Sequence, residues 1–146
     1  MQIINHAVKA AAREDRPVVD RVSLTWDERQ KSRQKLRTAG GKEIALALPT
    51  GTRLNAGDLL PTVEGWVEVE LTPEAVLLIK PRTVRETAFV AYHIGNRHLA
   101  LEITEDGLKT LHEPVFESYL RRQGIPVEQA QRPFNPVSAM SGPGHG

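Results

Sequence analysis

The chain of 146 residues contains no cysteine, and aromatic residues make up only 5% of it. The absence of cysteine excludes disulfide bonds, thiolate nucleophiles and cysteine-ligated zinc sites, and it fits a reducing compartment. A large excess of charge of one sign is also missing, because 19 Lys and Arg residues nearly balance 18 Asp and Glu residues and the formal net charge is +1. Nucleic-acid-binding proteins usually carry a dense positive surface and aromatic rings for base stacking, so we expect no nucleic-acid partner.

Long hydrophobic runs are absent as well. No apolar segment approaches the ~20 residues that a membrane helix needs. At the N-terminus, His6, Lys9 and Arg13 interrupt the sequence before it could form the apolar centre of a signal peptide. These absences predict a soluble, cytoplasmic protein that does not contact membranes.

Recognisable catalytic motifs are missing too. The segment at Gly40-Gly41-Lys42 lacks the first glycine and the Ser or Thr of a phosphate-binding loop. Residues 112–116 begin like the HExxH motif of zinc proteases, but Phe116 stands in place of the second histidine. A zinc-dependent hydrolase would also need a carboxylate base, for which there is no candidate. We therefore expect that the protein is not an enzyme.

The first half of the chain alternates between apolar and polar residues in short segments separated by turn residues. The alternating segments are residues 21–26, 42–49 and 66–71. Such closely spaced strands predict a small all-β module over residues 1–72. Residues 27–35, which read DERQKSRQK, contain no large apolar residue. We expect them to form a solvated strand edge or loop, or alternatively a surface that binds a partner protein.

The second half has a different pattern, which begins near Pro73. The apolar run AVLLIK is typical of a strand that is buried on both faces. Thr83 and Glu86 have the spacing of a capping box, and apolar residues at helical spacing predict a helix from Thr83 to about Gly95. These apolar residues are Val84, Ala88, Ala91, Tyr92 and Gly95.

Three further elements and a tail complete the second half. A hairpin with its turn at Asp106-Gly107 precedes a helix that begins at Pro114, with Val115, Tyr119 and Leu120 on its inner face, and a final strand follows. The order β-α-β-β-α-β predicts an α+β protein with a ferredoxin-like domain over residues 73–134. Residues 135–146 are rich in proline and glycine and predict a short, mobile tail.

Two of the five histidines, His93 and His98, lie in the segment AYHIGNRHLALEI at the end of the first predicted helix. In one interpretation, Gly95-Asn96 is an ordinary helix stop and His98 is a capping or core residue. In the other, His98 lies near a two-fold axis, and two copies of it bind one metal ion. Five residues correspond to about 500° of helical rotation, so His93 should not face the same ion within one chain.

Three segments give the sequence a resemblance to the UreE family of urease accessory proteins, which are nickel metallochaperones. They are LTWDERQKSRQKL, LPTGTRL with GDLL, and above all YHIGNRHLALEI. The resemblance runs from about Val19 to Phe134 and implies a β-rich domain that binds peptides or partners, followed by a ferredoxin-like metal-binding domain. It also implies a homodimer that binds Ni²⁺ through His98 at its interface. The implied partners are the urease maturation GTPase and the apo-urease accessory complex.

The resemblance extends less completely to other ligands. His112 matches one position of a peripheral histidine pair, but Pro114 stands at the second position. Many family members end in a histidine-rich tail, whereas this chain has only His145 there. We expect metal ligands among His98, His112, His145 and His93, with Ni²⁺ as cargo and Zn²⁺ or Cu²⁺ binding possible in vitro. The alternative is a non-catalytic peptide- or protein-docking module in which the histidines are structural.

Overall fold

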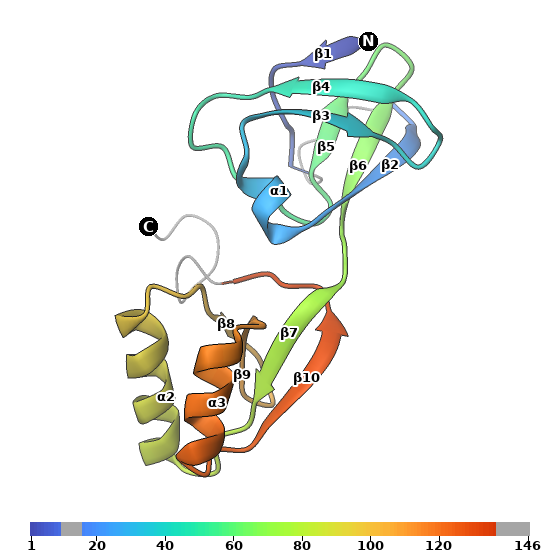
Figure 1. Ribbon diagram of the computed structural model, residues 1–146. Coiled ribbons are helices and arrows are strands. Elements are labelled where there is room, and N and C mark those ends of the chain that lie inside the picture. The colour runs from blue at the N-terminus through green and yellow to red at the C-terminus, as the bar shows by residue number, and fades with distance from the viewer. Residues whose placement is uncertain (10–15, 137–146) are drawn as a thin grey trace. The chain divides into compact units, whose positions relative to one another are not determined.

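The computed structural model describes residues 1–9 and 16–136. The chain divides into two compact units, Met1–Thr72 and Pro73–Gly146. The N-terminal unit consists mainly of strands, and the C-terminal unit combines one sheet with two helices (Figure 1). None of the described helices has the length and apolar content of a membrane-spanning segment.

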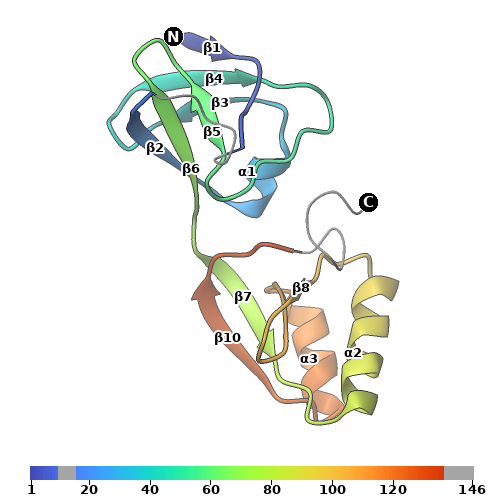
Figure 2. The same cartoon turned by 180° about the vertical axis from the view of Figure 1, so that it is seen from behind.

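Two three-stranded sheets form the N-terminal unit (Figures 1 and 2). One has the strand order β1-β4-β3 and the other the order β2-β6-β5. The alternating apolar residues of both sheets, including Val22, Ile44 and Val67, point into one shared core. The β-rich module is therefore confirmed. The strands are β1 (Gln2–Ile4), β2 (Val18–Leu24), β3 (Arg33–Arg37), β4 (Glu43–Ala47), β5 (Leu59–Pro61) and β6 (Trp66–Leu71).

The charged segment 27–35 is only partly the strand edge or loop that the sequence predicts. Its second part forms β3, which is an edge strand, but Trp26–Gln30 form the short helix α1. Thr25 caps this helix, because its hydroxyl accepts a hydrogen bond from the Glu28 N–H while the Glu28 carboxylate accepts one from the Thr25 N–H. The alternation of Trp26 with Leu24 predicts that Trp26 continues β2. In the structure it instead begins α1.

Arg29 in α1 is fully buried, although a charged segment predicts solvent exposure. Its guanidinium carbon lies 5.4 Å from the centroid of the Trp26 ring, and that of Arg53 lies 5.1 Å from the same centroid. Cation–π contacts of this kind join distant segments. Two of the segments that carry the family resemblance, around Trp26 and around Arg53, thus meet at one ring.

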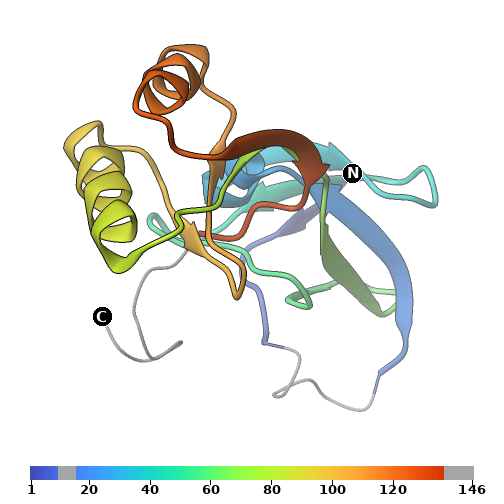
Figure 3. The same cartoon turned by 90° about the horizontal axis from the view of Figure 1, so that it is seen from below.

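The C-terminal unit has the predicted β-α-β-β-α-β order. Its sheet has the strand order β10-β7-β9-β8 with every neighbouring pair antiparallel, which is a ferredoxin-like arrangement. Both helices cover the same face of this sheet (Figure 3), and Leu77, Val90, Ile94, Phe116 and Leu120 belong to the core between them. The α+β fold class is confirmed. The elements are β7 (Glu74–Ile79), α2 (Val84–Asn96), β8 (Glu102–Ile103), β9 (Leu108–Leu111), α3 (Pro114–Arg122) and β10 (Val127–Arg132).

Helical spacing predicts where α2 and α3 lie but not which faces they bury. On α2, Val84 and Tyr92 are 88% and 66% exposed, whereas Val90 and Ile94 are buried. The inner face predicted for α3 is also partly wrong, because Val115 is exposed and the neighbouring Phe116 is buried. An apolar face of α2 therefore remains uncovered by the described residues of this chain.

Candidate metal centre

His98 lies one residue beyond the cap of helix α2 and is exposed. The helix ends in a Schellman motif, in which the His98 N–H donates to the Gly95 carbonyl at 3.0 Å and the Leu99 N–H donates to the Ile94 carbonyl at 3.1 Å. This motif requires a left-handed backbone at His98, where φ is 57°. The sequence favours Gly95-Asn96 for that conformation, but both residues remain inside the helix.

The left-handed backbone gives His98 a fixed direction at an energetic cost. A left-handed conformation costs a non-glycine residue about 1–2 kcal/mol, although histidine tolerates it better than most residues. Among the described residues, no other non-glycine residue has a positive φ. No hydrogen bond or ion pair with a described residue engages the imidazole. The backbone conformation thus fixes the direction in which the side chain leaves the main chain, and the imidazole is accessible to an external ligand.

His93 is held inside the unit by contacts between α2 and α3. Its Nε2 lies 3.4 Å from the Tyr119 hydroxyl, and its Nδ1 lies 3.4 Å from a guanidinium nitrogen of Arg97. The rings of Phe89 and Tyr119 pack against it, with centroid distances of 4.5 and 5.1 Å. Both ring nitrogens therefore already face polar groups of the same chain.

Arg97 connects the end of α2 to α3, a role that sequence reasoning missed. Its guanidinium carbon lies 4.7 Å from the centroid of the Tyr119 ring and 5.0 Å from that of Phe116. Because Arg97 directly precedes His98, these contacts fix the point from which the imidazole projects. In the sequence, only the position of Arg97 next to His98 could have pointed to this role.

His112 follows β9 and is half-buried beside helix α3. Its Nε2 lies 2.8 Å from the carboxylate of the buried Glu117. That carboxylate also accepts hydrogen bonds from Gln129 at 3.0 Å and from Arg121 at 2.7 Å. The contacts with Gln129, Arg121 and His112 lower the pKa of Glu117 to about 2. Only Nδ1 of His112 remains for a metal ion, with the carboxylate behind Nε2 as in many metal-bound histidines.

The candidate ligands do not form a site within one chain. Among residues 1–9 and 16–136, no group of three or more His, Asp or Glu side chains is placed to hold a metal ion. Pro114, at the position of the second peripheral histidine, begins α3. His145 lies outside the described residues. A site at His98 would thus need ligands from beyond the described part of this chain, such as a second copy.

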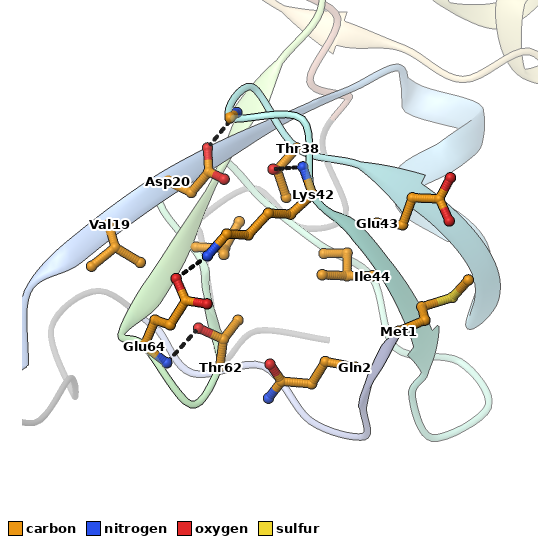
Figure 4. A pocket seen from close by; sticks show the side chains of 12 residues that line it. Met1, Gln2, Val19, Asp20, Thr38, Lys42, Glu43, Ile44, Thr62 and Glu64 are labelled. Carbon is orange, nitrogen blue, oxygen red and sulfur yellow. Dashed lines mark hydrogen bonds and ion pairs between the residues drawn. The ribbon is translucent and has the colours of Figure 1, made fainter.

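A cavity of about 510 Å³ opens in the N-terminal unit (Figure 4). Buried Ile44 and Val67 contribute apolar lining, while Lys42 and Glu64, which also line the cavity, form an ion pair with each other. No histidine lines it. The cavity and the candidate metal ligands described above therefore belong to different units.

Comparison with known proteins gives matches along the whole chain. The family models for the N-terminal and C-terminal domains of the UreE urease accessory protein match residues 2–72 and 74–146. The chain is 41% identical over 125 residues to the urease accessory protein UreE of Paraburkholderia xenovorans, and 40% identical over 123 residues to that of Cupriavidus necator. These alignments cover 85% and 84% of this chain but 56% and 64% of the two relatives, less than two thirds of their length. By both domain matches and these identities, the chain belongs to the UreE urease accessory protein family.

Proposed function

We propose that this protein binds Ni²⁺ and delivers it for assembly of the urease active site. Family membership supports a role in urease maturation. The observation that carries the metal assignment is His98, an exposed imidazole on a left-handed residue at a helix end. Strained backbone at a solvent-facing position is more common at functional sites than elsewhere.

The proposed site is shared by two copies of the chain. On α2, Val84, Ala88, Tyr92 and Gly95 fall within an arc of about 80° at ~100° per residue. This arc points away from the core, and a Cβ at Gly95 would meet no atom within 4 Å. Pairing of this face with its copy across a two-fold axis would bury the exposed apolar side chains. It would also bring the two His98 imidazoles toward one ion.

A site with two imidazoles and no thiolate suits a carrier. Its remaining positions, filled by water or by His145, would let an acceptor protein add ligands before the donor releases its own. Such nitrogen ligands bind copper more tightly than nickel, so selection of nickel depends on supply and on the docking partner. Protons compete with the metal below the ordinary pKa of imidazole, about 6.5, so affinity should fall on acidification.

The remaining roles follow from the same proposal. The nickel ion passes to the urease maturation GTPase and to the apo-urease accessory complex in the cytoplasm, and the β-rich unit docks these partners. His93 stabilises the contact of α2 with α3, and its aromatic and polar neighbours support this structural role. His112 would bind a second, peripheral ion through Nδ1, because its Nε2 faces Glu117.

The alternative is a non-catalytic docking module in which all the histidines are structural. The contacts of His93 and His112 within the chain favour it. The two proposals differ in metal stoichiometry, because only the carrier binds nickel through His98.

Calorimetric titration of nickel at pH 8 into the wild type and His98→Ala, with light scattering of both, tests the proposal. We expect about one nickel ion per dimer in the wild type, and loss of binding with retention of the dimer in the variant. Undiminished binding by His98→Ala would contradict the shared site. Equal wild-type affinities at pH 8 and pH 5.5 would contradict histidine ligation.

A further inference from the structure

The sheet β1-β4-β3 of the N-terminal unit buries one face and leaves the other open (Figure 1). Ile4, Leu36, Ile44 and Leu46 point into the core. Side chains alternate between the two faces of a strand. The residues that alternate with these four along β1, β3 and β4 therefore form the outer face. The strand registers align Ile3 with Ala45 and Lys35, Ala47 with Arg33, and Glu43 with Arg37.

One side of this outer face is apolar. Ile3 on β1 is 70% exposed, although large aliphatic side chains are usually buried. Ala45 and Ala47 on the central strand are small and half-buried, so they form a low floor beside Ile3. An external side chain could therefore reach the sheet surface without displacing any residue of the chain.

The other side of the face is positively charged. Residues 31–37 read KSRQKLR and contain four cations and no acid. Two of these cations have partners, because Lys31 pairs with Asp27 at 3.6 Å and Arg37 pairs with Glu43 at 3.0 Å. Arg33 and Lys35 are exposed, and neither has an ion pair or side-chain hydrogen bond with a described residue. Two positions along a strand are about 7 Å apart, so these cations form a short open row.

Protection of an edge strand explains only part of this arrangement. Lysine and arginine on edge strands commonly prevent unwanted pairing with other chains, which would account for Arg33 and Lys35. It does not account for exposed Ile3, which lies in the same row as Lys35 across Ala45. A nucleic acid or an anionic membrane would require a broader positive field, whereas the chain has a net charge of only +1.

We propose that this face, formed by Ile3, Arg33, Lys35, Ala45 and Ala47, docks an acidic peptide segment of a partner protein. Carboxylates of the segment face Arg33 and Lys35, and its apolar side chains lie on the alanines and against Ile3. Charge complementarity supplies the choice of partner and the apolar floor supplies contact area. The inference rests on the proposed docking role of the N-terminal unit but does not require metal binding.

The test compares two double charge reversals with the same change in net charge. Arg33→Glu with Lys35→Glu removes the row, and Arg122→Glu with Arg132→Glu alters exposed arginines of the C-terminal unit. The probe is a fluorescein-labelled peptide of glutamate and leucine, with binding followed by anisotropy. We expect the first variant to bind about tenfold more weakly or worse, and the second to bind like the wild type. Equal binding by both variants, or no binding by the wild type, would overturn the proposal.

Nuclear magnetic resonance on the wild type locates the contact without any variant that could unfold. Shifts confined to the five residues of this face on peptide addition would support the surface, and shifts elsewhere would refute it. Stronger binding to phosphatidylserine vesicles or to duplex DNA than to the peptide would overturn the choice of partner.

Nickel titration of the Arg33→Glu, Lys35→Glu variant separates this inference from the metal proposal. We expect this variant to bind nickel like the wild type while peptide binding is weakened. A wild type that binds the peptide but no nickel would support the docking surface and refute the carrier. The reverse result would refute the docking surface alone.

Discussion

The two helices of the C-terminal unit end in the same hydrogen-bonding motif, but with different residues at the left-handed position. After α3, Gly124 has φ 76°, its N–H donates to the Arg121 carbonyl, and the Ile125 N–H donates to the Leu120 carbonyl. After α2, His98 takes the same place with φ 57° and makes the equivalent bonds. In each case the next residue, Ile125 or Leu99, packs on the core.

This comparison separates what the fold needs from what it does not need. Both helix ends require a left-handed backbone, and glycine provides it without a steric penalty. A Cβ at Gly124 would meet no atom within 4 Å, so only the backbone conformation favours glycine there. Folding therefore gives no reason for a histidine at the matching end of α2, which leaves ligand binding as the explanation that we propose for His98.

The largest expected effect comes from replacing the histidine with the residue of the other helix end. His98→Gly keeps the Schellman motif but removes the imidazole, and we expect nickel affinity to fall by more than about 100-fold, beyond the usual cost of losing a supporting contact. Calorimetry measures the change. The exchange variant His98→Gly with Gly124→His should not recover binding, and recovery would show that any exposed helix-end histidine suffices.

Gly124→Ala tests the cost of a side chain at the left-handed position. Because the site has space for the Cβ, the change should lower the free energy of unfolding by about 1–2 kcal/mol through backbone strain alone. Urea unfolding measures it, with Gly95→Ala as a control within helix α2. Unchanged stability in Gly124→Ala would mean that the two helix ends do not share the proposed energetic requirement.

Arg97→Ala tests whether the end of α2 needs its attachment to α3. Loss of the contacts with Tyr119 and Phe116 should loosen the residue before His98 and weaken nickel binding about tenfold. Arg97→Lys keeps the charge but not the planar group, so its nickel affinity should lie between those of the wild type and Arg97→Ala. Nickel titrations and the absorption spectrum of bound nickel report both effects. Wild-type binding by Arg97→Ala would limit Arg97 to a structural role.

His98→Gly should also stabilise the protein that carries no metal. Removing the left-handed strain should raise the free energy of unfolding by up to about 1 kcal/mol, less any loss from the greater freedom of glycine in the unfolded chain. Urea unfolding in the presence of a chelator measures it. A clear loss of stability would mean that the His98 side chain contributes to the fold, contrary to the comparison with Gly124.

The smallest effect concerns Glu117, a buried charge on α3 that has no counterpart on α2. The pKa of Glu117 is lowered from 4.5 to about 2 in the folded protein, so its contribution to stability is complete above about pH 4.5. That contribution declines as the pH falls toward 2. Glu117→Gln should therefore show a smaller loss of urea resistance between pH 5 and pH 3 than the wild type. Parallel pH profiles would exclude a folded-state role for this carboxylate.

The order of the elements could be predicted from the sequence because it depends on local signals. Alternation, the Thr83 cap, the Asp106-Gly107 turn and Gly124 each act within a few residues. Helix α1 was missed although Thr25 and Glu28 have the same capping-box spacing as Thr83 and Glu86. The buried face of α2 was not predictable in the same way, since Phe89, Val90 and Ile94 compete with an equally apolar opposite face.

The candidate site was less accessible to sequence reasoning because it depends on contacts across the fold. Gly95-Asn96 offered better left-handed residues than His98, and only the hydrogen bonds of the helix end show which residue takes that conformation. The contacts of His93 with Tyr119 and of His112 with Glu117 join separate elements. The resemblance to the family singled out His98, and the backbone geometry supplies a physical reason for that choice.

The fixed backbone of His98 has a consequence for how a loaded carrier could be recognised. Because the main chain already sets the direction of the imidazole, metal binding has only the side-chain torsions to order and little entropy to remove. The end of α2 would then have nearly the same shape with and without its ion. A receiving protein would have to detect the cargo by contacting the metal ion itself, because the carrier's surface at this helix end would not change when the ion binds.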